Sequence, residues 1–127
     1  MKQLESDAHL ISISRIQKRA EGEISMLRLR GSVRGSTSTD FRGHLDEAGL
    51  RSPYLVVDLS ELEYINSTGL GMLLRQSEIQ ERRKGWMRVV APSPAVAMIL
   101  RLTGVAEKLS LHSDEEGALR DLPARAA

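Results

Sequence analysis

Two adjacent hydroxyl side chains, Ser67 and Thr68, lie where an apolar stretch passes into a helical pattern. They belong to the segment DLSELEYINSTGLGMLL, which covers residues 58–74. A serine in this position can cap the free backbone N–H groups of a helix start, and the spacing alone favours that role. Gly69 and Gly71 favour another role, because each costs a helix about 1 kcal/mol relative to alanine. Glycines allow another molecule to approach the backbone closely, and the hydroxyl of Ser67 would then be accessible to that molecule.

Catalysis at Ser67 has little support in the sequence. A nucleophilic serine needs a neighbouring base, and none of the three histidines lies near residue 67. The motifs Gly-x-Ser-x-Gly and Ser-x-x-Lys are absent as well. The pair Gly69-x-Gly71 matches only the beginning of a dinucleotide-binding fingerprint, since Leu74 replaces the third glycine. We therefore expect a protein that is not an enzyme, with small-nucleotide binding as a weaker alternative.

The composition argues against several other kinds of site. The chain of 127 residues has no cysteine, which rules out disulfides, thiolate zinc sites and a cysteine nucleophile. His9, His44 and His112 are far apart and lack ligand spacing, so we expect no metal and no cofactor. A net charge of +1 and 3% aromatic residues argue against a nucleic-acid partner.

The hydropathy pattern argues against a membrane protein. No apolar run approaches the ~20 residues that cross a bilayer. The segment MKQLESDAHL lacks the apolar region of a secretory signal. We therefore expect a cytoplasmic location without membrane insertion.

Strands are predicted where apolar residues alternate or form short continuous runs. Alternation predicts a hairpin of two strands, and the run YLVVDL predicts a central strand, covered on both faces, that ends at Leu59. The remaining strands are WMRVVA and a short one within EKLSLH. The predicted strands occupy residues 11–19, 24–29, 54–59, 86–91 and 107–112.

Helices are predicted where apolar residues at helical spacing lie between capping signals. Thr37 and Ser113, each with an acidic residue three positions later, are expected to cap the first and last helices. The helix that begins at the Ser67 junction carries an apolar stripe of Leu70, Leu73 and Leu74. The predicted helices occupy residues 37–49, 67–84, 94–103 and 113–122.

Strands and helices alternate after the opening hairpin, and crossover helices imply parallel pairing. The predicted fold class is therefore α/β, with a mixed, mostly parallel sheet of four to five strands and an N-terminal hairpin. We expect a single domain over residues 1–127, with a core of about 10–122 and flexible flanks at 1–9 and 123–127.

The segment VDLSELEYINSTGLGMLL, residues 57–74, resembles the signature of the STAS domain in bacterial anti-sigma factor antagonists, also called anti-anti-sigma factors. The resemblance covers most of residues 24–122. LRLRGSV resembles an early strand of the family with its turn at Gly31-Ser32-Val33, and PSPAVAMILRLTGV resembles a later helix. The resemblance implies a single STAS domain with about four helices packed mainly on one face of the sheet.

The resemblance also implies a function, which is partner switching in transcription regulation. The first hydroxyl of the family motif accepts a phosphate, and here this residue is Ser67, with Thr68 as the second candidate. The implied partners are an anti-sigma factor serine/threonine kinase and a metal-dependent serine phosphatase. The kinase binds the unmodified chain and phosphorylates it, which releases the chain, and the phosphatase removes the phosphate. While the unmodified chain occupies the kinase, the sigma factor is free.

Two regions depart from the family pattern. The family commonly has an aspartate before the acceptor, whereas this chain has Asn66, which has no charge and cannot act as a base. The early turn of the family is often acidic, whereas this chain has Ser32 and Arg34. An arginine near the acceptor can either pair with a phosphate on Ser67 or match an acidic partner.

Methionines on two helices suggest where a partner binds. Met72 lies opposite the apolar stripe of its helix, and Met98 lies off the stripe of the next helix. Helix packing is the favoured interpretation, and an apolar contact surface beside the acceptor is the sharper hypothesis. The full set of candidate contact residues is Gly31, Ser32, Arg34, Asn66, Thr68, Gly69, Gly71, Met72 and Met98.

A second functional hypothesis is a STAS subunit that docks without switching, in a stressosome-like scaffold or a lipid-transport complex. A weak homodimer is a further expectation. The substitution Ser67→Asp separates the two hypotheses, because only a switching partner should respond to the added charge.

Overall fold

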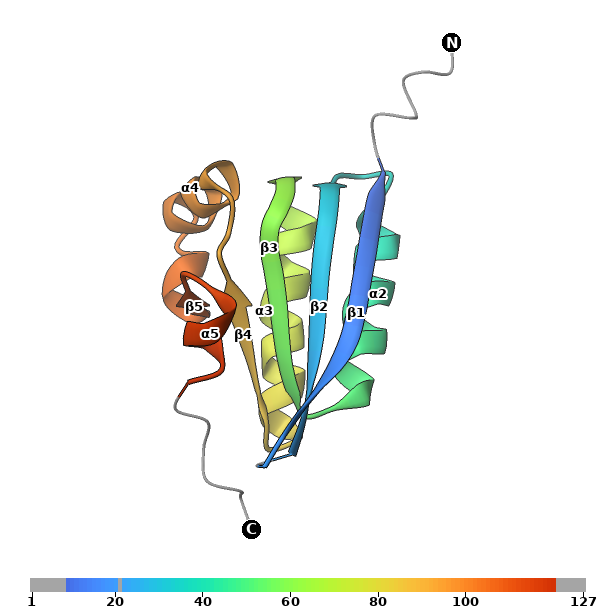
Figure 1. Cartoon of the computed structure of the whole chain (residues 1–127). Coiled ribbons are helices and arrows are strands. Elements are labelled where there is room, and N and C mark those ends of the chain that lie inside the picture. Colours follow the sequence, from blue (N-terminus) through green and yellow to red (C-terminus); the bar gives the residue numbers. More distant parts are fainter. Residues whose placement is uncertain (1–8, 21, 121–127) are drawn as a thin grey trace.

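The computed structural model describes residues 9–20 and 22–120, which form one five-stranded sheet with its covering helices (Figure 1). The strands lie in the order β1-β2-β3-β4-β5. β1 and β2 form an antiparallel hairpin, while β2 to β5 are parallel to one another. The strands are Leu10–Arg19, Gly22–Val33, Tyr54–Ile65, Trp86–Val90 and Ser110–His112. The predicted α/β class with a mixed, mostly parallel sheet is therefore confirmed.

Helices alternate with the strands and lie mainly on one face of the sheet. They are α2 (Ser38–Arg51), α3 (Ser67–Arg82), α4 (Pro94–Leu102), the 3-10 helix η1 (Val105–Lys108) and α5 (Glu115–Ala118). α2 and α3 cover one face, and the short α5 lies over the other (Figure 1). The larger core includes buried residues of α2, α3 and α4. The smaller core, next to α5, consists of Ile24, Met26, Val56, Val90 and Ala118.

β3 is longer than predicted, and its length determines where Ser67 lies. The apolar run ended the predicted strand at Leu59, but β3 continues through a polar half to Ile65. Two register shifts in the pairing of β3 with β2 accommodate this extension, and Leu62 and Ile65 are buried within it. Ser67 therefore begins a helix almost directly after a strand, not after a polar loop.

Thr37 is the N-cap residue of α2, as predicted, but its side chain does not cap the helix, and Ser113 was the wrong cap for α5. The hydroxyl of Thr37 caps no helical N–H; it donates to the carbonyl oxygen of Ser32 at 2.7 Å and accepts from the N–H of Arg34 at 2.9 Å. α5 is capped by Asp114 rather than by Ser113, since the Asp114 carboxylate accepts a backbone N–H three residues later at 2.7 Å. Thr37 instead stabilises the loop that follows β2.

The contact between α2 and α3 contains a buried polar ladder that was not predicted. α3 buries Gln76 and Gln80, whereas Leu74, expected on the buried stripe, is only half-buried. Gln80 Nε2 donates to the carbonyl oxygens of Ser52 and Pro53, each at 2.9 Å. Gln76 Nε2 donates to Gln80 Oε1 at 2.8 Å. The ladder thus joins α3 to the segment that leads from α2 into β3.

Gly49 lies inside α2, which continues to Arg51 instead of ending at the glycine as predicted. A Cβ at position 49 would collide with Gln76 Nε2 and lie 2.6 Å from Gln80 Oε1. A side chain at position 49 would therefore displace the amide groups of the ladder.

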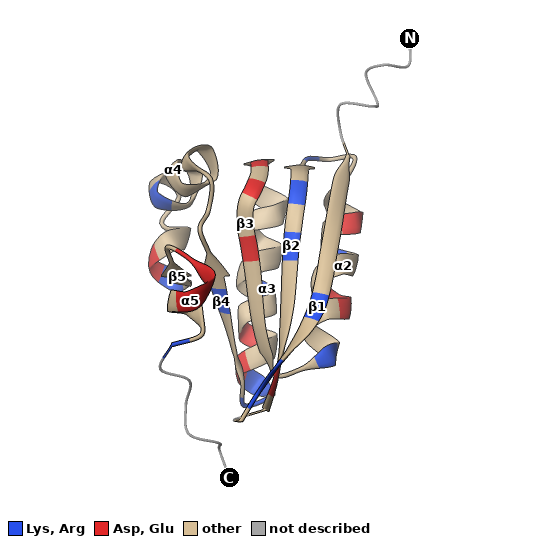
Figure 2. Ribbon diagram, in the orientation of Figure 1, with Lys and Arg blue, Asp and Glu red and all other residues tan. Residues whose placement is uncertain are grey.

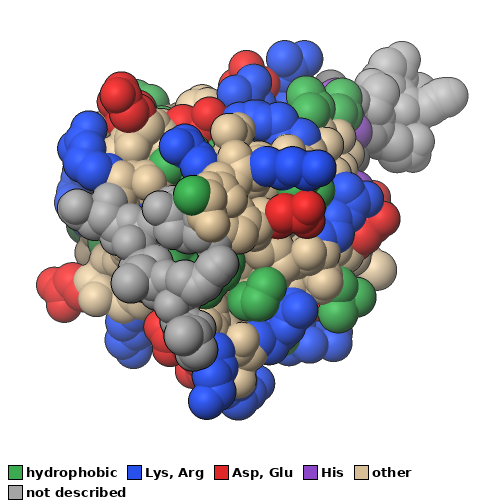
Figure 3. Space-filling view, turned by 60° about the horizontal axis from the view of Figure 1, so that its bottom comes forward, with side chains coloured by type: hydrophobic (Ala, Val, Ile, Leu, Met, Phe, Trp, Pro, Cys, Tyr) green, Lys and Arg blue, Asp and Glu red, His purple; other side chains and the backbone are tan. Residues whose placement is uncertain are grey.

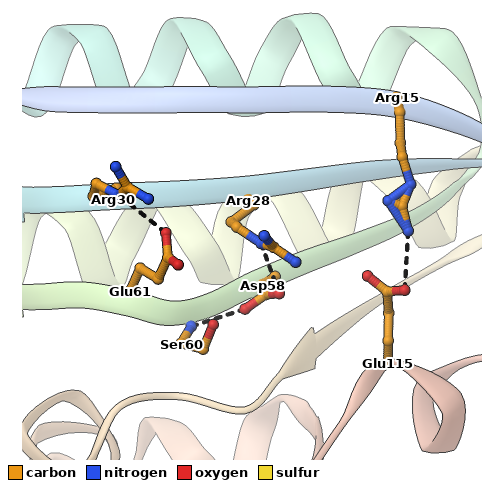
Figure 4. A network of polar contacts seen from close by, with 7 residues as sticks. All are labelled: Arg15, Arg28, Arg30, Asp58, Ser60, Glu61 and Glu115. Carbon is orange, nitrogen blue, oxygen red and sulfur yellow. Dashed lines mark hydrogen bonds and ion pairs between the residues drawn. The ribbon is translucent and has the colours of Figure 1, made fainter.

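The face of the sheet opposite α2 and α3 is open above β1, β2 and the end of β3, and it carries charges of both signs (Figure 2). Arg28 Nε lies 3.2 Å from Asp58 Oδ2, and Arg30 Nε lies 3.1 Å from Glu61 Oε1 (Figure 4). A third pair joins β1 to α5. The exposed pairs Arg30–Glu61 and Arg15–Glu115 contribute about 0.2–1 kcal/mol each at most, whereas Asp58 in the first pair is buried. The first two pairs nevertheless occupy the two arginines of β2.

Charge is also mixed at the end of the molecule where α3 finishes. Figure 3 brings this end forward and shows basic, acidic and apolar side chains interspersed on that face. Among the described residues on this face, acidic and apolar side chains interrupt the basic ones.

Most of the two predicted flanks lies outside the described residues, as does Leu122, the predicted end of the last helix. His9 is the exception, and it is held in place rather than free. Its carbonyl oxygen accepts a hydrogen bond from the N–H of Ser32 at 3.2 Å.

Candidate functional site

Ser67 is the first residue of α3 and is exposed at the carboxyl end of β3. Asn66 precedes it as the N-cap, and its Oδ1 accepts a hydrogen bond from the N–H of Gly69 at 2.8 Å. The carbonyl oxygen of Asn66 accepts the first helical hydrogen bond, from the N–H of Leu70 at 3.0 Å. Asn66 therefore performs the capping that spacing alone had favoured for Ser67.

The hydroxyl groups of Ser67 and Thr68 are available to an outside molecule. Both residues are exposed, and neither hydroxyl has a hydrogen-bond partner within the described part of the chain. Their backbone N–H groups belong to the first turn, where a helix supplies no acceptor of its own. The junction therefore presents unused donors and two unused hydroxyls to solvent.

Gly69 and Gly71, which the sequence placed in one motif, have different surroundings. Gly69 is buried, and a Cβ there would lie 2.7 Å from Ile65 Cγ1 and 2.8 Å from Val33 Cγ1. Gly71 is exposed, and a Cβ there would meet none of the described atoms within 4 Å. Gly69 is thus required for packing α3 on the sheet, and only Gly71 leaves the backbone open to another surface.

The loop after β2 lies beside the start of α3. The carbonyl oxygen of Val33 accepts a hydrogen bond from the N–H of Asn66 at 3.0 Å, which joins the end of β2 to the cap of α3. Arg34 follows Val33, and its guanidinium carbon lies 4.6 Å from the centre of the Tyr64 ring. Arg34 and Tyr64 are both exposed. The fold therefore brings an arginine that is distant in sequence to the junction that carries Ser67.

The surroundings of Ser67 favour an added negative charge. The first turn of α3 contains no acidic residue, and the positive end of the helix dipole lies there. Asn66 caps the helix without a charge, whereas a carboxylate at the same place would repel a phosphate. Free N–H groups at a helix start also bind phosphate oxygens. A phosphoryl group on Ser67 is therefore compatible with the fold.

Two of the predicted contact residues, Gly31 and Ser32, are buried and offer a partner no surface. Gly31 has a φ of 116°, and a Cβ there would collide with the carbonyl oxygen of His9. Ser32 is 4% exposed, and its carbonyl oxygen accepts the hydrogen bond from Thr37. These two residues therefore support the loop that presents Arg34, and a direct contact role does not fit their burial.

The two candidate methionines differ in exposure. Met72 is half-buried and packs against the main core, so the packing interpretation applies to it. Met98 is 52% exposed on α4, and Leu102, one turn later, is 79% exposed. The contact hypothesis therefore applies to Met98 rather than to Met72.

Ser93 joins α4 to the same end of the sheet, a role that was not predicted. Its hydroxyl donates to the carbonyl oxygen of Leu62 at 2.6 Å, and its N–H donates to that of Leu59 at 3.3 Å. A groove between β3 and α4 is lined by residues 60–63 and 93–95. Ser93 is also the N-cap of α4, because its hydroxyl accepts the N–H of Val96 at 3.4 Å. Pro94 at the first helical position was the sequence signal that could have identified this cap.

Within residues 9–20 and 22–120, no three histidine or acidic side chains are grouped so that they could hold a metal ion. None of the helices in the same ranges is both long enough and apolar enough to cross a membrane.

The mixed five-stranded sheet, its opening hairpin and the serine at the start of α3 define a STAS-type α/β domain. A family model described as "Mlab, STAS domain" matches residues 16–112, which is more than half of the chain. The chain therefore belongs to the STAS-domain family, as the signature predicted.

Similar proteins include anti-sigma factor antagonists. An anti-sigma F factor antagonist from Paenibacillus polymyxa is 29% identical over 101 residues, which cover 78% of this chain and 86% of that protein. An anti-sigma factor antagonist from Mycobacterium paratuberculosis, solved by crystallography, is 25% identical with a TM-score of 0.71. The match covers 86% of this chain and 92% of that one.

The Bacillus cell fate determinant SpoIIAA shares the fold. It has been solved in an unphosphorylated and a phosphorylated form, with TM-scores of 0.63 and 0.57 to this chain. Each match is 18% identical and covers 84% of this chain, together with 93% and 96% of the two SpoIIAA chains.

Proposed function

We propose that this chain is an anti-sigma factor antagonist that switches partners through phosphorylation of Ser67. The observation that carries the proposal is the exposed, unpaired hydroxyl of Ser67 beside a cap supplied by Asn66. Because Asn66 closes the first turn, Ser67 can be modified without loss of a structural hydrogen bond. The similarity to anti-sigma factor antagonists supports the class of partner.

In the proposed cycle, the unmodified chain binds a serine/threonine kinase that is also the anti-sigma factor. Ser67 Oγ attacks the γ-phosphorus of ATP bound to that kinase, and the bond from this phosphorus to the β–γ bridging oxygen breaks as ADP leaves. The serine proton goes to a base on the kinase, since Asn66 cannot accept it. The chain itself is a substrate and a binding module, not an enzyme.

The phosphate would change the contact surface rather than the fold. It adds about −1.5 to −2 charges where a partner had fitted a bare serine. Losing roughly 3 kcal/mol of binding free energy lowers affinity about 100-fold. A metal-dependent serine phosphatase would then hydrolyse the ester and restore the binding form. These partners place the proposed cycle in the cytoplasm.

The proposed contact surface lies around the start of α3. It comprises Ser67 and Thr68, the exposed backbone at Gly71, Arg34 on the adjacent loop and Met98 on α4. Ser67, Thr68 and Gly71 lie within the first two turns of α3. Ser93 fixes the beginning of α4 to the segment of β3 that leads to α3. A partner that covers this end of the sheet would therefore cover the acceptor.

The test is a phosphorylation reaction with the anti-sigma factor kinase of the same organism and ATP, read by site-resolved mass spectrometry. We expect one phosphate on the wild-type chain and on Thr68→Ala, and none on Ser67→Ala. Phosphate on Ser67→Ala, or none on the wild type, would overturn the assignment of the acceptor.

A docking subunit that does not switch is the second candidate. The observation that favours it is the description of the matching family, which names Mlab rather than an antagonist. In that case Ser67→Asp would leave binding of every partner unchanged.

A further inference from the structure

We propose that Arg34 is a phosphate-binding residue that captures the phosphoryl group on Ser67. Its guanidinium would leave the Tyr64 ring and pair with the phosphate, so that modification moves the Arg34 side chain on the loop after β2. The proposal rests on the proposed function only in taking Ser67 as the acceptor. It adds the movement of the Arg34 side chain to the proposed switch. This arginine lies in the turn where the family pattern is often acidic.

The backbone of Arg34 is fixed beside the acceptor. The hydrogen bond from Asn66 N–H to the Val33 carbonyl oxygen, at 3.0 Å, connects the residue before Arg34 to the residue before Ser67. Thr37 accepts the N–H of Arg34 at 2.9 Å and thereby holds the start of the loop. Only the side chain of Arg34 has to move, because its backbone already lies at the site.

The guanidinium of Arg34 is available to pair with a phosphate on Ser67. Within the described residues it forms no ion pair with a carboxylate, and its guanidinium carbon lies 4.6 Å from the centre of the exposed Tyr64 ring. A cation–π contact at an exposed site is weak, whereas a guanidinium–phosphate pair is charge-assisted and can be bidentate. Arg28 and Arg30, on the same sheet, are already paired with Asp58 and Glu61.

The charges around the junction agree with this role. The start of α3 supplies unused N–H groups, and Asn66 adds no negative charge. The exposed carboxylate of Glu63 is the opposing group nearby in β3, while that of Glu61 is held by Arg30. Arg34 is thus the cation in the described structure best placed to offset the second charge of a phosphate at residue 67.

The consequence is that one modification produces two surface changes. In the unmodified chain, a partner meets a neutral hydroxyl and a guanidinium that lies over the Tyr64 ring, not paired with an anion among the described residues. In the phosphorylated chain, it meets an anion whose neighbouring arginine is already engaged. A partner that uses an acidic group to bind Arg34 would lose that contact together with the fit to Ser67.

The test uses the full chain with phosphoserine incorporated genetically at position 67, so that no kinase or partner is needed. The second pKa of the phosphate is measured by phosphorus NMR in the wild type, in Arg34→Gln and in the matched control Arg30→Gln. Pairing with Arg34 favours the dianion, so we expect a pKa below that of free phosphoserine, about 6. Arg34→Gln should raise it, and Arg30→Gln should leave it unchanged. An equal pKa in all three proteins would overturn the proposal.

A second readout follows the Tyr64 ring. Its NMR resonances should shift on phosphorylation of the wild type and not in Arg34→Gln, with circular dichroism confirming that each variant is folded. Unmoved Tyr64 resonances in the wild type would show that Arg34 stays on the ring, which also overturns the proposal. Partner release that still depends on phosphorylation would in that case leave the proposed function intact.

Discussion

Asn66 Oδ1 accepts a hydrogen bond from the N–H of Gly69 at 2.8 Å, and this contact closes the first turn of α3 without using Ser67. The structural role therefore belongs to Asn66, and the proposed regulatory role belongs to its neighbour Ser67. The cap stabilises the helix start, and the next side chain is left exposed. A phosphate on Ser67 would replace no existing hydrogen bond.

The cap can be tested by substitution at Asn66. Asn66→Ala should lower the free energy of unfolding by about 0.5–2 kcal/mol, because the N–H of Gly69 loses its acceptor. Asn66→Asp keeps an acceptor and should stay close to the wild type in urea denaturation. If alanine and wild type unfold at the same urea concentration, Asn66 is not the functional cap.

The two glycines should respond in opposite directions to alanine. Gly69→Ala places a Cβ 2.7 Å from Ile65 Cγ1 and should cost about 1–3 kcal/mol through overpacking. Gly71→Ala meets open space and should stabilise the helix by up to about 1 kcal/mol. Thermal unfolding of both variants checks this pair. A stabilising Gly69→Ala would contradict the packing at the start of α3.

The buried ladder of α3 should be sensitive to loss of its amide. Gln80→Leu removes the donor to the carbonyl oxygens of Ser52 and Pro53 and the acceptor of Gln76 Nε2. The Pro53 oxygen still accepts the N–H of Trp86 at 3.1 Å, so the Ser52 oxygen and the Gln76 amide lose their partners, which should cost about 1–3 kcal/mol. Gln76→Leu is the matched control, since Gln76 Oε1 has no partner among the described residues and the substitution removes fewer hydrogen bonds. In urea denaturation, the free energy of unfolding should be lower for Gln80→Leu than for Gln76→Leu. The reverse order would contradict the ladder.

His112 should make stability depend on pH. Its pKa is lowered from 6.5, first by burial and then by the charge of Arg88, while Asp114 acts in the opposite direction. As pH falls below 6.5, the unfolded chain takes up the proton first, so the folded state loses stability until the lower folded pKa is passed. His112→Gln removes this loss. Parallel stability–pH curves for the two proteins would contradict the lowered pKa.

The alternation of elements was predictable because hydrophobic periodicity reports which face of each element is buried. The end of β3 was not predictable in this way. Its second half, residues 60–65, is largely polar because one side faces solvent, where Glu61 pairs with Arg30 of β2. Only pairing with the neighbouring strand identifies such a segment as β-structure.

The candidate site was predicted in position but not in the role of each residue. Among adjacent polar residues, the one that caps a helix is selected by backbone conformation, which composition does not reveal. This is why Asn66 rather than Ser67, and Asp114 rather than Ser113, carry the caps. Gly31 and Gly69 resembled contact residues because glycines needed for internal packing and for an approaching partner look the same in a sequence.

The central claim is that a phosphate on Ser67 expels a partner from an otherwise unchanged domain. Its most direct test is calorimetric titration of the anti-sigma factor with the unmodified chain, Ser67→Ala and the chain carrying phosphoserine at 67, with phosphoserine at exposed Ser113 as the charge control. We predict similar affinity for the first two and for the control, and binding about 100-fold weaker for phosphoserine at 67, equal to roughly 3 kcal/mol. Equal affinity of all four proteins would contradict the account.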